Sequence, residues 1–398
     1  MTDEINGSAR SGVSTIDVAS IERELNALWK DAGKADGESG VTRACVMNLV
    51  VYTEPGASGL EDTLTEITAA HPGRAIVLAA DREATDSGMQ SHVRSHCALP
   101  TATTKQVCCE QVTINVRGKS LNEAHSAVAP LLLADMPVYL WRRGTPHLTD
   151  RAFMRLTEMA NRVIIDSAAF DDPHGDLIGL ALLMRDRPRQ TAISDLNWAR
   201  LTAWRQLIAG FFDIAEYRPA LESFNRVSIR YAPRQNFPEA IPPRVMLITG
   251  WIAGRLGWRL DKVSRPGGGV AARFEFLAHN RRVFVELRAT DDKNAGAGYL
   301  SRVELKTESF AEESSDALFA VARNTEGTRL ETRILLGYET RAGRVLGYER
   351  DSESHLIHRE LDFLGHDRVY EQALRTAADL LIALAHQGDK HEPEGRGE

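Results

Sequence analysis

Arginine and tryptophan residues cluster in two segments of the chain. Arg142 and Arg143 directly follow the apolar run Pro137–Trp141, and in an open parallel sheet ligands and partners favour the carboxyl ends of the strands. The segment Asp195–Arg205 interleaves tryptophans with arginines, the residue types that are enriched at interaction hot spots. In one interpretation both tryptophans pack inward and the arginines pair with nearby acids. In the other, which is the hypothesis to test, an interface or anion-binding cluster consists of Arg142, Arg143, Trp198, Arg200, Trp204 and Arg205.

A second group of reactive residue types lies within eighteen positions and consists of His92, His96, Cys97, Cys108 and Cys109. Thiolate and imidazole are zinc ligands, but these cysteines do not form a C-x2-C pair, and adjacent cysteines in a strand point to opposite faces. The sequence therefore predicts no metal site. Four cysteines in the whole chain are too few for a disulfide framework. We expect reduced thiols, with a redox role for Cys97, Cys108 and Cys109 as an alternative.

The motifs of nucleotide binding and hydrolysis are missing from the sequence. No G-x-G-x-x-G follows a strand-like run, and G-x-x-x-x-G-K-[ST], G-x-S-x-G and H-E-x-x-H do not occur. The glycine run Pro266–Gly269 is typical of a hairpin turn. Acidic loop residues such as Asp81 and Asp172 are interpreted as solvated or helix-capping residues. We therefore expect a protein that is not an enzyme and that uses no cofactor.

The composition indicates an ordinary globular protein with more than one domain. The 398 residues are 43% hydrophobic and 26% charged, and a chain of this length usually exceeds one hydrophobic core. The net charge of −7 disfavours nucleic acid as the main partner. No run approaches the roughly 18 apolar residues of a membrane span, and Met1–Ser20 lacks the apolar core of a signal peptide. The expected location is cytoplasmic, with no membrane as partner.

The first half of the chain alternates strand-like and helix-like segments. Continuous apolar runs indicate strands that are covered on both faces. A helix opened by Ser120–Glu123 would begin with a capping box, and Thr149 or Asp150 would cap another helix. The expected strands are 44–52, 74–80, 111–116, 137–141 and 162–166, with helices at 60–70, at 120–133 and after residue 150. This alternation predicts an α/β fold with an N-terminal, mainly parallel sheet and flanking helices.

The second half changes to short strands with polar–apolar alternation, which is typical of an antiparallel meander. Gly250, in a helix expected from Pro243, would permit close approach of a neighbouring element. A final amphipathic helix is expected to end near Gly388. We predict an N-terminal helix and loop at 1–40, an α/β domain with covering helices at 41–215, an α+β domain with an antiparallel meander at 216–388 and a disordered tail at 389–398.

Several blocks of this sequence resemble the OpcA family of proteins. The block Asp195–Ile208 is the most specific of them, because it places several large residues in one order. The matching blocks lie between about residues 40 and 260, and they are His71–Ala75, Cys108–Ile114, Pro130–Gly144, Asp195–Ile208 and Gly250–Trp258.

The resemblance implies a function that composition and spacing do not show. Proteins of this family bind glucose-6-phosphate dehydrogenase and favour its active oligomeric state, so the expected partner is glucose-6-phosphate dehydrogenase. Such a protein needs an interaction surface and no catalytic group. The main alternative is a phosphosugar- or nucleotide-binding enzyme or sensor that uses the arginine cluster. A redox sensor acting through its cysteines is a further alternative.

Overall fold

The computed structural model describes residues 16–35, 42–43, 45–98, 107–186, 190–291, 296–310, 315–348, 351–363 and 365–388. Most of the loop predicted to end at residue 40 and the whole tail predicted at 389–398 lie outside these residues. The chain forms two compact units. Unit 1 comprises Met1–Ala169, Arg185–Leu196 and Ser352–His366, and unit 2 comprises Phe170–Met184, Asn197–Asp351 and Asp367–Glu398. The predicted domain boundaries stay a prediction.

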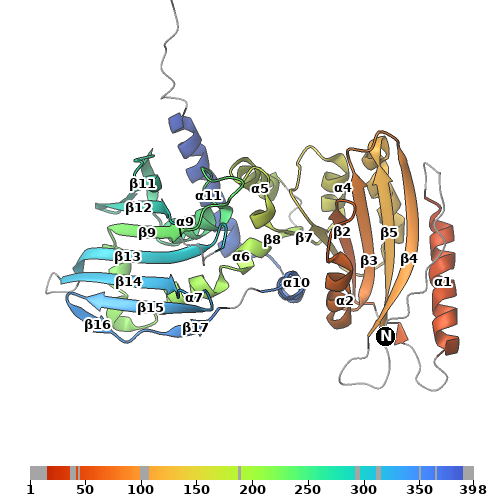
Figure 1. The fold of residues 1–398 in the computed structure, drawn as a ribbon, viewed down its shortest axis with the longest axis horizontal. Coiled ribbons are helices and arrows are strands. Elements are labelled where there is room, and N and C mark those ends of the chain that lie inside the picture. The colour runs from red at the N-terminus through yellow and green to blue at the C-terminus, as the bar shows by residue number, and fades with distance from the viewer. Residues whose placement is uncertain are drawn as a thin grey trace, which may run out of the picture. The chain divides into compact units, whose positions relative to one another are not determined.

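Unit 1 contains, within its described residues, an eight-stranded sheet that is almost entirely parallel (Figure 1). Its central order is β5-β3-β2-β6-β7-β8, all parallel, while β4 pairs antiparallel and β1 parallel with β5. The predicted mainly parallel sheet is confirmed. The strands are β1 (Thr42–Arg43), β2 (Met47–Thr53), β3 (Gly73–Asp81), β4 (Gly88–Ala98), β5 (Val107–Arg117), β6 (Val138–Arg142), β7 (Arg162–Ile165) and β8 (Ala192–Asp195).

This strand order is that of a doubly wound nucleotide-binding sheet. In such a sheet all strands stay parallel, and the side on which successive strands are added changes once. Here the chain moves outward from β2 through β3 to β5 and then returns to the other side of β2 with β6. The carboxyl ends of β2 and β6 are therefore the switch point, where open α/β sheets place their ligands. Every residue of β2 is buried, including the polar Asn48 and Thr53, which explains its mainly apolar sequence.

The helices of unit 1 include one clear departure from the sequence prediction. The single helix expected at 120–133 is divided into a 3-10 helix at Gly118–Glu123, a short α3 and a second 3-10 turn, and no side-chain cap is formed at its start. The capping-box prediction is wrong, because Ser120 lies inside a 3-10 helix that already begins at Gly118 and so does not occupy the N-cap position. The helices are α1 (Val18–Ala35), α2 (Leu60–Ala70), α3 (Ala124–Val128), α4 (Arg151–Met159) and α10 (Glu353–Asp362).

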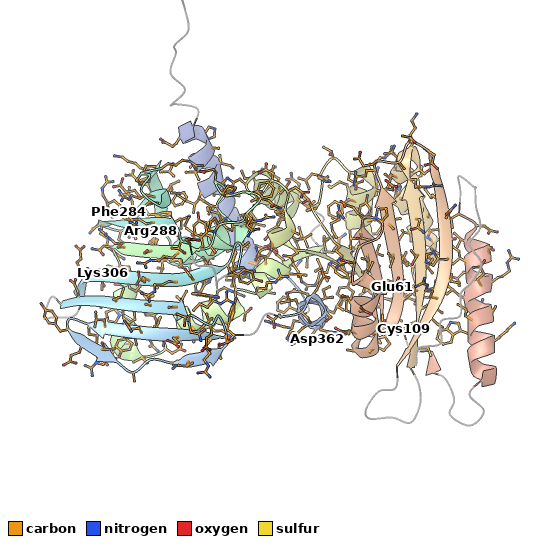
Figure 2. All side chains as sticks on the ribbon, in the orientation of Figure 1. Glu61, Cys109, Phe284, Arg288, Lys306 and Asp362 are labelled. Carbon is orange, nitrogen blue, oxygen red and sulfur yellow. The ribbon has the colours of Figure 1, made fainter. Side chains whose placement is uncertain are left out.

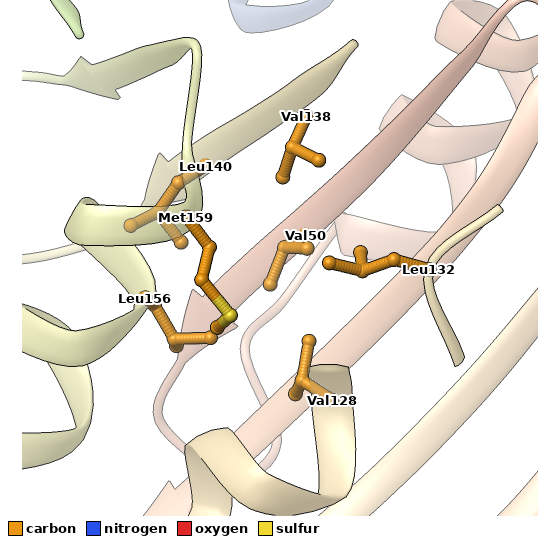
Figure 3. Close-up of a pocket in the computed structure, with 7 residues that line it drawn as sticks. All are labelled: Val50, Val128, Leu132, Val138, Leu140, Leu156 and Met159. Carbon is orange, nitrogen blue, oxygen red and sulfur yellow. The ribbon is translucent and has the colours of Figure 1, made fainter. Parts of the chain in front are cut away.

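The core of unit 1 is apolar around β2, β6, α3 and α4. Asp150 caps α4 as predicted, since its Oδ1 accepts hydrogen bonds from the backbone nitrogens of Ala152 at 3.0 Å and Phe153 at 3.3 Å. Figure 3 shows a small pocket in this core that offers no polar side chain to orient a ligand, so we interpret it as core packing. It is lined by Val50, Val128, Leu132, Val138, Leu140, Leu156 and Met159.

Unit 2 contains, within its described residues, a nine-stranded sheet in the order β10-β11-β12-β9-β13-β14-β15-β16, with β17 paired to β15. The sheet is mostly antiparallel, as predicted, but β9 lies parallel to β12 and antiparallel to β13. The strands are β9 (Arg226–Tyr231), β10 (Arg259–Ser264), β11 (Val270–Ala278), β12 (Arg281–Ala289), β13 (Leu300–Phe310), β14 (Ser315–Arg323), β15 (Arg329–Leu336), β16 (Glu339–Arg341) and β17 (Val345–Gly347).

The helices of unit 2 include the expected glycine-assisted helix pair. A Cβ atom on Gly250 of α9 would overlap the carbonyl oxygen of Ala373 in α11, so the close approach predicted at this glycine is confirmed. No helix in the described part of the chain is long and apolar enough to cross a membrane. The helices are α5 (Gly175–Asp186), α6 (Leu196–Ala199), α7 (Thr202–Gly210), α8 (Ala220–Ser223), α9 (Pro243–Arg255) and α11 (Arg368–Gly388).

Candidate functional site

Arg142 lies at the switch point of the unit 1 sheet, as the sequence predicted from its place after an apolar strand. It is the last residue of β6, and its neighbour strand β2 ends one residue after Tyr52. The guanidinium of Arg142 lies over the ring of Tyr52, with 5.0 Å from Cζ to the ring centroid. Its Nη1 donates to the carbonyl oxygen of Tyr52 at 3.2 Å and to that of Arg143.

The guanidinium of Arg142 is a buried cation with spare hydrogen-bonding capacity. The residue is only 2% exposed, and burial lowers its pKa, although an arginine remains charged in proteins. Its Nε is buried and has no hydrogen-bond partner among the described residues. A buried charged donor of this kind is costly unless a partner or an anion satisfies it. The residue is thus suited to contact a bound carboxylate or phosphate.

Tyr52, Asp150 and Arg82 form a closed polar group beside Arg142. The hydroxyl of Tyr52 donates to Oδ2 of Asp150, and Arg82 forms an ion pair with the same carboxylate and donates to the tyrosine hydroxyl at 3.1 Å. Burial, followed by the hydrogen bond to Asp150, raises the pKa of Tyr52, so this phenol stays protonated. The group positions the aromatic ring beneath Arg142 and provides no activated nucleophile.

Arg143 connects the end of β6 to two other segments of unit 1. Its Nη2 lies 3.1 Å from Oε2 of Glu353 in α10 and donates to the carbonyl oxygen of Ser58, at 2.9 Å, in the loop before α2. Its Nη1 is buried without a hydrogen-bond partner among the described residues. Arg143 therefore positions the loop that follows β2, and it leaves one donor next to the buried Arg142.

The tryptophan–arginine segment of unit 2 is built around Trp198. This residue is 4% exposed, and its Nε1 donates to Oδ2 of Asp367 at 2.9 Å. The guanidinium of Arg205 stacks on its indole, with 3.7 Å from Cζ to the ring centroid, which is a favourable cation–π geometry. Trp204 is 1% exposed and meets the ring of Tyr348 edge to face. Arg200 is half-buried.

The six residues predicted as one cluster belong to two different units. Arg142 and Arg143 lie in unit 1, whereas Trp198, Arg200 and the remaining two lie in unit 2. Both tryptophans are buried in the interior of unit 2, as the inward-packing interpretation requires. An interface or anion-binding role for these six residues stays a prediction. The two tryptophans would contribute to such a role by positioning arginines and not by touching the ligand or partner themselves.

The cysteines differ from one another in state. Cys109 is a free, buried thiol whose pKa is raised by burial, which makes it a poor nucleophile. Cys108 is disulfide-bonded, so the expectation of reduced thiols is wrong at this position. The backbone register of β4 and β5 sets residues 97 and 108 opposite each other, and such pairs bring Cα atoms within disulfide range. The side chain of Cys97 lies outside the described ones.

Sequence reasoning missed the residues that hold the switch-point arginines in place. The sequence predicts Tyr52 only as the last residue of a strand and Asp150 only as a helix cap. Glu353 is more than two hundred positions from Arg143 along the chain, and nothing in the sequence relates the two residues. In the described part of the chain, the switch point holds no nucleophile paired with a base. The groups that it does hold are buried guanidinium donors, and their role in binding an anion or a partner's acidic group stays a prediction.

Two family models match this chain. The model described as the glucose-6-phosphate dehydrogenase subunit N-terminal domain matches residues 64–182. The model described as the C-terminal domain of the same subunit matches residues 191–374. The residues that the two models match include parts of both compact units.

Three curated relatives carry the name OxPP cycle protein OpcA. The protein from Synechocystis sp. is 28% identical over 328 residues, which are 81% of this chain and 66% of that protein. The proteins from Nostoc punctiforme and Synechococcus elongatus are 27% and 28% identical, over 81% and 80% of this chain and 68% and 70% of their own lengths. The chain thus spans about two thirds of the length of the curated relatives that it matches.

The solved structures to which this chain has a distant likeness include two oxidoreductases. The one from Sinorhizobium meliloti has a TM-score of 0.41 and 9% identity, over 88% of this chain and 91% of that chain. The oxidoreductase yvaA from Bacillus subtilis has a TM-score of 0.44 and 9% identity, over 86% of this chain and 98% of that chain. At these TM-scores, nothing about these enzymes is carried over to this chain.

Proposed function

Because this chain belongs to the OpcA family of glucose-6-phosphate dehydrogenase subunits, we propose that it is a non-catalytic regulatory protein that binds glucose-6-phosphate dehydrogenase. In this proposal it promotes the assembly or allosteric activation of the dehydrogenase in the cytoplasm and so supports the oxidative pentose phosphate pathway. The observation that carries the proposal is the match of both family models, which together run from residue 64 to residue 374 with one short gap.

The physical mechanism of such an activator is a shift of populations. A protein that binds the competent conformation or oligomer of an enzyme more tightly than the incompetent one increases the competent fraction. This requires differential binding energy and no chemistry of its own. The switch-point group is consistent with that requirement, because it offers buried cationic donors without an activated nucleophile.

The proposal is tested by kinetics with the cognate dehydrogenase. Initial rates are measured across glucose-6-phosphate concentrations with and without this protein, and the protein alone serves as the blank. We expect a lower half-saturation point or a higher maximal rate, no turnover in the blank, and co-elution of the two proteins in size-exclusion chromatography. Unchanged rates without co-elution would remove the proposal, and turnover in the blank would contradict a non-catalytic role.

A second candidate function is a sensor or enzyme that binds a phosphosugar or a nucleotide at the switch point. The observation that favours it is the buried Nε of Arg142, which has no hydrogen-bond partner among the described residues. A ligand that binds only the folded state raises the unfolding temperature. Thermal unfolding with millimolar glucose 6-phosphate or nucleotide tests this candidate, and the Arg142→Lys variant should lose any stabilisation, because lysine lacks the planar donor fork of arginine. No stabilisation by any of these compounds would remove it.

A further inference from the structure

One face of the unit 2 sheet carries rows of like charge that neither the core nor the switch point explains. The three neighbouring strands β12, β9 and β13 are held in a register that sets their face residues directly opposite one another. We call these nine residues the β9 face. From one end of the strands to the other, its rows are Arg288–Arg230–Arg302, Glu286–Ser228–Glu304 and Phe284–Arg226–Lys306. Figure 2 labels Phe284, Arg288 and Lys306.

The β9 face is the solvent side of these strands. The alternate residues Val227 and Ile229 of β9 are fully buried, and the aromatic ring of Phe319, on the neighbouring β14, packs against Phe211 and Phe224 on that buried side. Side chains of opposite parity point to the opposite face of a sheet. The three rows therefore project away from the core of unit 2.

Cations form the outer layer of this face and carboxylates the inner layer. The side chains of Arg230 and Lys306 are 44% and 39% exposed, whereas those of Glu286 and Glu304 are 8% and 17% exposed. Oε1 of Glu286 is held by Arg273 of β11 at 2.7 Å. The face thus presents basic groups of long side chains to solvent above carboxylates that are already bound.

The row of three arginines carries an energetic cost in the isolated chain. Arg230 has an arginine directly opposite it on each side, and like charges in directly opposite positions destabilise a sheet. Glu286 and Glu304 offset part of this cost, since Glu286 lies 2.6 Å from Arg288, and Glu304 lies 3.0 Å from Arg302 and 3.7 Å from Arg230. In the third row, Lys306 lies 3.0 Å from Asp316. Arg226 forms no ion pair with any described residue. The β9 face holds five basic and two acidic residues, in a chain whose net charge is −7, so its basic character is local.

We propose that the β9 face is a docking surface for an acidic surface of a partner protein. The inference rests on the proposed function, so the partner is glucose-6-phosphate dehydrogenase, recognised through carboxylates that reach the two cationic rows. Complementary charge steers association and fixes register. The row that contains Glu286 and Glu304 separates the two cationic rows, which favours a protein surface with separate carboxylates over the closely spaced phosphates of nucleic acid.

The test is a charge reversal that leaves the close ion pairs of the sheet intact. In Arg226→Glu/Arg230→Glu, Glu286 retains Arg273 and Glu304 retains Arg302. The matched control, Arg368→Glu/Arg375→Glu, makes the same change of charge at exposed positions of α11. The dissociation constant for the dehydrogenase is measured for the full chain between low and high salt. Unfolding curves check folding, and Arg226→Ala/Arg230→Ala replaces the reversal if that variant does not fold.

We expect the face variant to bind about tenfold or more weakly at low salt and with less salt dependence, because fewer charges contribute to the encounter. The control should bind as the wild type does. Equal affinity of the wild type and the face variant would overturn the docking surface while the proposed function stands. A wild-type chain that does not bind the dehydrogenase would overturn the proposed function and this assignment together. Binding of duplex DNA that the face variant loses would overturn the choice of a protein partner.

Discussion

At the scale of single residues, the switch point illustrates which parts of a site can be predicted from sequence. Arg142 could be placed there because an apolar strand ends in front of it, and its place at the end of β6 follows. Its burial could not be predicted, since burial results from Tyr52 on the neighbouring strand and from the loop after β2, which Arg143 holds through Ser58. Residue type and strand position are local properties, whereas the environment of a side chain depends on segments that are distant in the sequence.

We expect Arg142→Ala/Arg143→Ala to weaken activation of the dehydrogenase if the switch point contacts the partner. The double variant removes two guanidinium groups that hold unpaired buried donors, and loss of an arginine hot spot costs at least about 2 kcal/mol of binding free energy. The measurement is the activator concentration that gives half-maximal stimulation, alongside an unfolding curve.

The control for this variant is Arg155→Ala/Arg185→Ala, which removes two exposed arginines, one on α4 and one on α5, that pair with neighbours on their own helices. It should activate as the wild type does. Full activation by a folded Arg142→Ala/Arg143→Ala protein would show that these two arginines do not contact the partner.

At the scale of elements, the local pattern of apolar and polar residues predicts most strands and helices. It does not predict which strands lie beside one another in a sheet. The alternation in Arg226–Tyr231 is that of a half-buried strand, yet nothing in it shows that β9 lies between β12 and β13. This order arises because the chain leaves β9 through α9 and returns by β10 and β11, so that β12 closes on β9 in parallel. The edge strand Gly88–Ala98 was not predicted, because it is rich in polar residues and its partner strand supplies most of the apolar burial.

The crossing of α9 and α11 leads to a prediction about two glycines on one helix. Gly250→Ala should destabilise the protein by about 1–3 kcal/mol, since a Cβ there would overlap backbone atoms of Ala373 and Ala377 that cannot move independently. Gly254→Ala is the matched comparison, because its Cβ would meet the side chains of Thr376 and Gln372 instead. In a helix, alanine is favoured over glycine by about 1 kcal/mol, so this variant should be close to neutral. The measurement is the free energy of unfolding of both variants in urea. Equal destabilisation by the two substitutions would contradict this prediction.

His174 predicts a pH dependence for the start of α5. Its Nε2 accepts a hydrogen bond from the backbone nitrogen of Ile241 at 2.9 Å, and burial, with Arg265 as a lesser cause, lowers its pKa below 6.5. The unfolded chain therefore binds this proton more readily than the folded chain. The stabilising contribution is complete above the unfolded pKa and is lost as the pH falls below about 6.5 towards the folded pKa.

The measurement for His174 is the free energy of unfolding at pH 7.5 and pH 5.5. The difference between these two values should be smaller in His174→Gln, whose amide oxygen can accept the same hydrogen bond at either pH. The same difference in the variant and the wild type would assign the pH dependence to other groups. His358, whose pKa is also lowered by burial, is present in both proteins and cancels in the comparison.

At the scale of the whole molecule, the chain passes repeatedly between its two compact units. It leaves unit 1 after Ala169, re-enters at Arg185, leaves after Leu196 and returns once more for Ser352–His366. Linkers and composition shifts in the sequence predict domains that are continuous along the chain. The segments that change unit are not recognised in this way, because each of them has the pattern of an ordinary helix or strand. That α10 belongs to unit 1 follows only from three-dimensional contacts such as the ion pair of Arg143 with Glu353.

Removal of all residues after Asp351 should therefore destabilise both units rather than one. In unit 1, Arg162 is 4% exposed and donates to the carbonyl oxygens of Phe363 and Gly365, each at 2.7 Å. Arg162 would keep only the Ser194 hydroxyl among these acceptors, and a buried cation that loses its main partners costs up to about 3–5 kcal/mol. In unit 2, the indole of Trp198 loses its acceptor Asp367, and α9 loses the helix against which Gly250 packs.

A chain ending at Asp351 should lose the cooperative unfolding transition, or show it at a much lower urea concentration, with the tryptophan fluorescence of both units affected. Unit 1 holds two of the six tryptophans, Trp29 and Trp141, and unit 2 holds the other four, so the signal of unit 1 is read in a chain whose unit 2 tryptophans are replaced by phenylalanine. A chain ending at Gly388 is the matched control and should unfold as the full chain does. If only the unit 2 signal shifts, the segment Ser352–His366 does not stabilise unit 1, although Arg143 and Arg162 contact it.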